Sequence, residues 1–182
     1  ETFFLVADAR FRRNKGGYRE AFLEKAKFFA YADCRMSDMA TFADVLLPCR
    51  SHYEVFDLRV NPGYHRHANV SQPAKGLKHI GESKDEWEIS TLIITKIQEL
   101  AKAKFEATGD KDVLHIPDSS HSQTGFRELD QIVELFTDGG RLGTDKQAVE
   151  FALKYVPQFR GETMESAVGR GGFLSINEKG GK

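Results

Sequence analysis

Three short apolar runs lie in the first quarter of the chain, and polar stretches separate them. They are Phe3–Ala7, Phe28–Ala32 and Asp44–Pro48, the last of which is closed by proline. Runs of this length that are apolar on successive residues are typical of strands covered on both faces. We therefore expect three strands in the first 50 residues.

The segments between these runs have helical features. Tyr18–Lys27 carries apolar residues at helical spacing, and Ser37 or Asp38 is a suitable cap for a short helix through Phe42. Strands that alternate with helices predict an α/β fold, with a parallel sheet and crossover helices.

The rest of the chain is predicted to be irregular and then mostly helical. Cys49–Lys84 is polar and lacks periodicity, whereas Trp87–Lys104 is periodic, with Ser83 as a cap and Glu86 at the capping-box position. Ala107–Thr124 is predicted to be a loop. The later predictions are a helix over Phe126–Phe136, a turn over Asp138–Gly143, a helix over Asp145–Tyr155 capped by Thr144 and stopped by Pro157, a short helix over Thr163–Val168 and a strand over Phe173–Ile176.

Charge and hydropathy exclude two classes of protein. The formal net charge is -1, so no basic field favours nucleic acid as a partner. No apolar run approaches the roughly 20 residues of a membrane-spanning helix. The chain opens at Glu1 directly into a strand-like run, so we expect it to be a piece of a longer polypeptide.

Cysteine is scarce. Cys34 and Cys49 are the only two, too few to hold an iron–sulfur cluster or a structural zinc ion unaided. We expect both to be buried thiols.

Polar side chains follow the first two predicted strands. The first strand is followed by Asp8, Arg10, Arg12, Arg13, Asn14 and Lys15. The second is followed by Asp33, Arg35 and Ser37. Ligands of open parallel sheets bind at the carboxyl ends of the strands, and arginine pairs well with phosphate. A solvated basic turn and a capped turn are the alternative interpretations of these two segments.

Two motifs resemble the dimethyl-sulfoxide-reductase family of molybdopterin enzymes. Ala32–Pro48 resembles the family's strand-end Asp, short helix and Ala-Asp-Val-Val-Leu-Pro strand, with Glu54 as the glutamate beyond it. Gly81–Ile89 resembles the Gly-Glu-(Ser/Ala)-Lys-x-(Asp/Glu)-Trp-(Glu/Gln)-Ile start of a family helix. Asn61–Pro73 departs from the common Gly-Arg-x-Gln pattern and resembles the type II branch, above all the catalytic subunit of nitrite oxidoreductase.

The resemblance implies a Rossmann-like lobe over residues 1–108 that binds the guanosine diphosphate arm of one molybdopterin guanine dinucleotide. Residues 109–182 would be a helical extension that leads to the next domain. Asp33 would contact guanine or ribose, with Arg35 and Ser37 near phosphate. The same arm would be flanked by Asp8, Arg10, Arg12, Arg13 and Asn14. Here Ala7-Asp8-Ala9 departs from the family's Gly-x-Asn.

The resemblance also implies cofactors and partners. The cofactor would be molybdenum bis(molybdopterin guanine dinucleotide), with an iron–sulfur cluster in an earlier domain. Partners would be the remaining domains of the same subunit, an iron–sulfur electron-transfer subunit, and a haem or membrane-anchor subunit. The substrate would be a small oxyanion, with nitrite and nitrate as the expected pair. No catalytic residue and no metal ligand is predicted in this chain.

Two other functions are compatible with the same residues. One is a stand-alone nucleotide-binding or regulatory α/β module. The other is a metal hydrolase that uses His52, His65, His67 and Asp57, since imidazole and carboxylate are common metal ligands.

Overall fold

The computed structural model describes residues 3–7, 27–37, 40–60, 67–117, 126–159 and 161–175 of the 182. Contacts divide the chain into two compact units. Unit 1 comprises Glu1–Val55 and Pro73–Asp85, and unit 2 comprises Phe56–Gln72 and Glu86–Lys182. The predicted division into residues 1–108 and residues 109–182 is a different division of the chain, and it stays a prediction.

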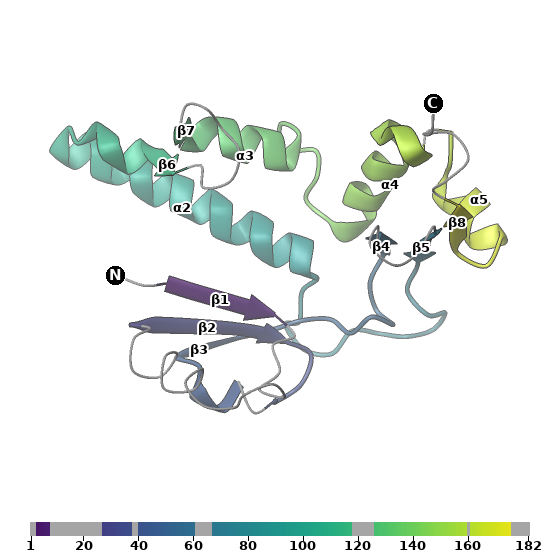
Figure 1. The fold of residues 1–182 in the computed structure, drawn as a ribbon. Helices are drawn as coiled ribbons and strands as arrows, with labels where there is room; N and C mark the ends of the chain where they lie inside the picture. The colour runs from purple at the N-terminus through teal and green to yellow at the C-terminus, as the bar shows by residue number, and fades with distance from the viewer. Residues whose placement is uncertain are drawn as a thin grey trace, which may run out of the picture. The chain divides into compact units, whose positions relative to one another are not determined.

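Unit 1 contains a parallel sheet in the order β1-β2-β3 (Figure 1). Its elements are β1 (Phe3–Ala7), β2 (Phe28–Asp33), the 3-10 helix η3 (Ala40–Phe42) and β3 (Val45–Pro48). The three predicted strands are therefore confirmed, and so is the α/β class. The predicted helix through Phe42 is only a single 3-10 turn in the described residues, and residues 18–26 of the predicted Tyr18–Lys27 helix lie outside them.

The central strand β2 is buried from Phe29 to Ala32, which explains why its sequence is apolar without alternation. Asp44 fixes the start of β3 beside it. The backbone N–H of Asp44 donates to the carbonyl of Phe29 at 2.8 Å, and the Asp44 carboxylate accepts from the N–H of Phe29 at 2.7 Å. The acidic residue of the motif therefore aligns two strands.

Unit 2 contains an antiparallel sheet in the order β4-β5-β8. Its strands are β4 (Asp57–Val60), β5 (His67–Ser71) and β8 (Phe173–Ser175). The first two lie in the segment predicted to be irregular, so that prediction was wrong. Ala68 and Val70 of β5 are buried, while His67, Asn69 and Ser71 between them are exposed. The strand predicted over Phe173–Ile176 is confirmed as β8, but its pairing with the distant strand β5 has no signal in the local sequence.

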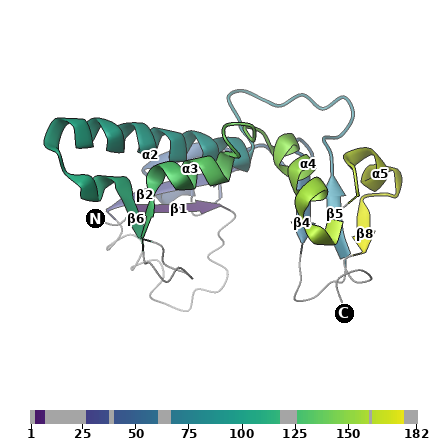
Figure 2. The same cartoon turned by 90° about the horizontal axis from the view of Figure 1, so that it is seen from above.

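Helices and a hairpin complete unit 2, and α2 and α3 run alongside each other when viewed from above (Figure 2). The elements are α2 (Glu86–Thr108), η4 (Lys111–Leu114), β6 (His115–Pro117), β7 (Phe126–Glu128), α3 (Leu129–Thr137), α4 (Asp145–Tyr155), η5 (Pro157–Phe159) and α5 (Met164–Gly169). Thr144 caps α4 through a capping box, as predicted. The predicted Ala107–Thr124 loop contains η4 and β6, and the predicted helix at Phe126 starts only after β7. None of the helices in the described residues is long and apolar enough to cross a membrane.

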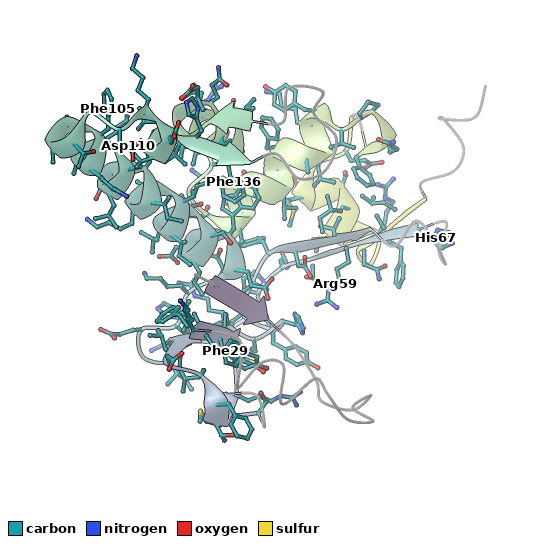
Figure 3. All side chains as sticks on the ribbon, turned by 60° about the vertical axis from the view of Figure 1, so that its left-hand side comes forward. Phe29, Arg59, His67, Phe105, Asp110 and Phe136 are labelled. Carbon is teal, nitrogen blue, oxygen red and sulfur yellow. The ribbon has the colours of Figure 1, made fainter. Side chains whose placement is uncertain are left out.

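The start of α2 differs from the prediction. The helix begins at Glu86, so the buried Asp85 precedes it, and the Ser83 hydroxyl instead donates to the carbonyl of Ile80 at 2.9 Å. Trp87 stacks on Phe136, labelled in Figure 3, with ring centroids 4.5 Å apart.

The core of unit 2 joins its sheet to α4 and α5. Its buried residues are Ala68, Val70, Val149, Leu153, Phe159, Ala167 and Leu174. Gly172 lies directly against β5, because its carbonyl accepts from the N–H of Val70 at 2.7 Å, and its φ of +80° is a conformation that glycine adopts readily.

Candidate functional site

The carboxyl ends of the three parallel strands of unit 1 meet at one edge of the sheet. Ala7 pairs with Ala32, and Asp33 pairs with Pro48. The N–H of Cys49 donates to the carbonyl of Asp33 at 3.1 Å, which extends the β2–β3 pairing to the edge itself. This is the position at which open parallel sheets bind ligands.

A cavity of about 410 Å³ lies at this edge. It is lined by Tyr31, Asp33, Cys34, Arg35, Met36, Ala40, Leu46, Leu47 and Pro48. The volume is in the range of small-molecule sites, and an apolar wall with a few polar groups is their usual composition. Asp33 and Arg35 bring one carboxylate and one guanidinium to it.

A chain of hydrogen bonds reaches Asp33 from inside the unit. The Ser37 hydroxyl donates to the Tyr31 hydroxyl at 2.8 Å, and the Tyr31 hydroxyl donates to Oδ2 of Asp33 at 2.8 Å. Tyr31 is 1% exposed. The Asp33 carboxylate is therefore held by a buried donor.

The segment before α2 returns to the end of β3. Cys49 and Lys84 form a parallel bridge, with the N–H of Lys84 donating to Pro48 at 3.1 Å and the N–H of Arg50 donating to Lys84 at 2.9 Å. Nη1 of Arg50 lies 3.6 Å from Oδ2 of Asp85, whose side chain is 2% exposed. The two sequence motifs are thus joined in unit 1.

No known family model matches the chain, but individual proteins do. Dimethylsulfide dehydrogenase subunit alpha of Rhodovulum sulfidophilum is 38% identical over 180 residues, 96% of this chain and 18% of that protein. Chlorate reductase subunit alpha of Ideonella dechloratans is 29% identical over 164 residues, 90% of this chain and 16% of that protein. Respiratory nitrate reductase subunit alpha of Haloferax mediterranei is 32% identical over 102 residues, 55% of this chain and 10% of that protein.

The chain is a homologue of the alpha subunits of the dimethyl-sulfoxide-reductase family of molybdoenzymes. The resemblance inferred from the motifs is therefore confirmed. The chain spans less than a fifth of the length of each of these relatives.

The residues expected to bind the molybdoenzyme cofactor are only partly described. Asp33 and Arg35 line the cavity, and Ser37 reaches it through Tyr31. The other expected residues lie outside the described part of the chain: Asp8, Arg10, Arg12, Arg13 and Asn14. Tyr31 was missed, although a tyrosine two residues before a strand-end Asp shares its face of the strand.

Glu54, the glutamate of the molybdoenzyme motif, shapes the turn that follows β3. Its Oε2 accepts from the N–H of Ser51 at 2.8 Å and from the Ser51 hydroxyl at 2.7 Å. These bonds, the backbone one first, lower the pKa of the Glu54 carboxyl. The charged form of Glu54 therefore stabilises a turn next to the Arg50–Asp85 pair.

The two described histidines of the hydrolase alternative, His52 and His67, give it no support. His52 and His67 are exposed, and His65 lies outside the described residues. Within the part of the chain that the structure describes, no three His, Cys, Asp or Glu side chains form a group that could hold a metal ion.

Cys34 is exposed, contrary to the prediction that it is buried, because it follows the strand end and lies in the turn. Partial desolvation is the largest cause that raises the pKa of the Cys34 thiol, and a hydrogen bond with Asp33 and the negative charge of Asp33 raise it further.

Because the thiolate is the reactive form, alkylation of Cys34 by iodoacetamide should require a higher pH than alkylation of an unstructured cysteine peptide. Peptide mass spectrometry separates Cys34 from the buried Cys49.

The matched variant for this measurement is Asp33→Asn, which removes the negative charge. The pH midpoint of Cys34 alkylation should then move down, because the neighbouring charge no longer disfavours the thiolate. An unchanged midpoint would contradict the coupling between these two side chains.

Proposed function

We propose that the chain is a segment of the catalytic subunit of a molybdenum oxidoreductase, and that the cavity in unit 1 binds the guanosine diphosphate arm of its pterin cofactor. The observation that carries the proposal is the placement of Asp33 and Arg35 together at the carboxyl edge of a parallel sheet. The match to molybdoenzyme alpha subunits over nearly the whole chain supports it.

The side chains at this edge suit such a ligand. A carboxylate accepts hydrogen bonds from the N–H groups of guanine or from ribose hydroxyls, and a guanidinium pairs with phosphate oxygens. Asp33 and Arg35 provide one of each, and Leu46 and Leu47 add apolar surface. The basic segment after β1 is proposed to flank the same arm, through Asp8, Arg10, Arg12, Arg13 and Asn14.

The role of the chain's own residues would be to bind and orient. The molybdenum cofactor, when bound, supplies the oxygen-atom and electron transfer. We propose that the whole enzyme interconverts nitrite and nitrate, or a related oxyanion. The names of the chlorate, perchlorate and nitrate reductase relatives support an oxyanion as the substrate. The 38% identity to dimethylsulfide dehydrogenase favours oxidation of a small organic sulfide as a second candidate.

Partner chains are part of the proposal. The relatives are named as alpha subunits, which supports at least one further subunit. We propose an iron–sulfur electron-transfer subunit, with a haem or membrane-anchor subunit beyond it, and an iron–sulfur cluster in another domain of the catalytic subunit.

Nucleotide binding tests the site. GDP should raise the melting temperature of the intact protein produced in a host that cannot make the pterin cofactor, and ADP should raise it less. Asp33→Asn and Arg35→Ala should each weaken GDP binding about 10-fold, because each removes a charge-assisted hydrogen bond. Calorimetric titration gives the affinities.

Asp112→Asn and Arg141→Ala are the matched controls, since both residues are exposed and belong to unit 2. They should leave GDP affinity unchanged. An intact protein that does not bind GDP would contradict the assigned site, and a protein purified from its native source without molybdenum or tungsten would contradict the assigned enzyme class.

A further inference from the structure

Tyr31 combines a buried ring with a hydroxyl that reaches the carboxylate of the cavity. The residue is 1% exposed, and its ring packs edge-on against Phe29 with centroids 6.0 Å apart. Tyr31 and Asp33 are two residues apart on β2, so their side chains lie on the same face of the strand. The phenol therefore has one fixed direction, along the strand toward the edge.

The hydrogen bond from Tyr31 limits how the Asp33 carboxylate can turn. Rotation of a carboxylate about its last torsion is otherwise loosely restricted. The phenol donates to Oδ2 at 2.8 Å, and Ser37 donates to the phenol oxygen at 2.8 Å. A donor that itself accepts a hydrogen bond is strengthened by it. Within the described part of the chain Asp33 also accepts the weak thiol hydrogen bond of Cys34, and the remaining lone pairs of its two oxygens are the ones that a ligand would use.

We propose that Tyr31 is a positioning residue that sets how Asp33 recognises the nucleotide, an inference that rests on the proposed function. A carboxylate with a fixed plane selects a ligand that presents two adjacent donors in that plane. Guanine presents the N1–H and the 2-amino group, and ribose presents its two neighbouring hydroxyls. A freely turning carboxylate would accept from single donors almost as well and would discriminate less.

The test compares the affinities of the intact, cofactor-free protein for GDP, IDP and 2′-deoxy-GDP. IDP lacks the 2-amino group of guanine, and 2′-deoxy-GDP lacks one ribose hydroxyl. The wild-type protein should prefer GDP over one of the two analogues, and that analogue identifies the donors. Tyr31→Phe should weaken GDP binding about 10-fold and remove the preference. Ser37→Ala should reduce the same preference by a smaller factor.

Tyr53→Phe is the control, because Tyr53 belongs to the same unit and is exposed; it should keep both affinity and preference. The inference is overturned if the Tyr31→Phe protein keeps the wild-type preference, or if it binds all three nucleotides more weakly by the same factor. In that case GDP binding by the wild-type protein still supports the proposed function. A wild-type protein without GDP affinity overturns both. If Tyr31→Phe does not fold, an unchanged preference in Ser37→Ala overturns the inference.

Discussion

Replacing Asp85 with alanine is expected to lower the free energy of unfolding by about 3 kcal/mol, because it removes a buried carboxylate that lies beside the partly buried guanidinium of Arg50 and compensates its charge. Asp85 is 2% exposed and Arg50 is 23% exposed, with 3.6 Å between Nη1 and Oδ2. Urea unfolding followed by circular dichroism measures the change. GDP affinity should fall as well. Arg50 directly follows Cys49 and β3, which pair with β2, and β2 ends at Asp33.

Two further variants separate the causes of that loss. Asp110→Ala removes an exposed aspartate that accepts from the N–H of Asp112 at 3.0 Å, and should cost only about 1 kcal/mol. Arg50→Met combined with Asp85→Leu removes both charges and should restore most of the stability, since buried ion pairs often exchange for apolar pairs at little cost. A double variant as unstable as Asp85→Ala would disprove the unpaired-charge explanation.

Gly172→Ala is expected to destabilise unit 2 by about 4 kcal/mol. A Cβ atom at this position would lie 2.4 Å from the carbonyl oxygen of Val70, and that oxygen is backbone of the central strand β5. Relief of the clash would move Gly172 away and break the 2.7 Å hydrogen bond from the N–H of Val70. The midpoint of urea unfolding should therefore fall sharply.

The neighbouring glycine provides the matched control. Gly171 has a φ of +76°, close to the +80° of Gly172, but a Cβ there meets nothing within 4 Å. Gly171→Ala should cost only the backbone strain of a left-handed alanine, about 1 kcal/mol. Equal losses in the two variants would show that strain, and not the contact with Val70, accounts for the effect.

Elements whose signals are local could be predicted from the sequence. The continuous apolar runs identified β1, β2 and β3, and the cap at Thr144 identified the start of α4. The strands β4 and β5 were missed because pairing stabilises them: β4 pairs with β5, and β5 also pairs with the distant β8. A short polar strand has little intrinsic preference, and its conformation is decided by the neighbour it pairs with.

Some residues of the candidate site could likewise be predicted from the local sequence, and others could not. Asp33, Arg35 and Ser37 could be selected because they follow a buried strand, and all three belong to the described cavity or its hydrogen bonds. The role of Tyr31 depends on a hydroxyl-to-carboxylate distance, and the Arg50–Asp85 contact joins residues far apart in the chain. Neither can be inferred from local spacing.

The discontinuous composition of the two units has a consequence for biosynthesis. The chain leaves unit 1 after Val55, returns at Pro73 and leaves again after Asp85. The strand β5 pairs with β8, which lies about 100 residues later in the chain, near residue 174. A nascent polypeptide on the ribosome therefore exposes one unpaired edge of β5 until almost the whole segment has emerged. Open strand edges favour association with other chains, so premature termination of translation before β8 would leave a product prone to aggregate.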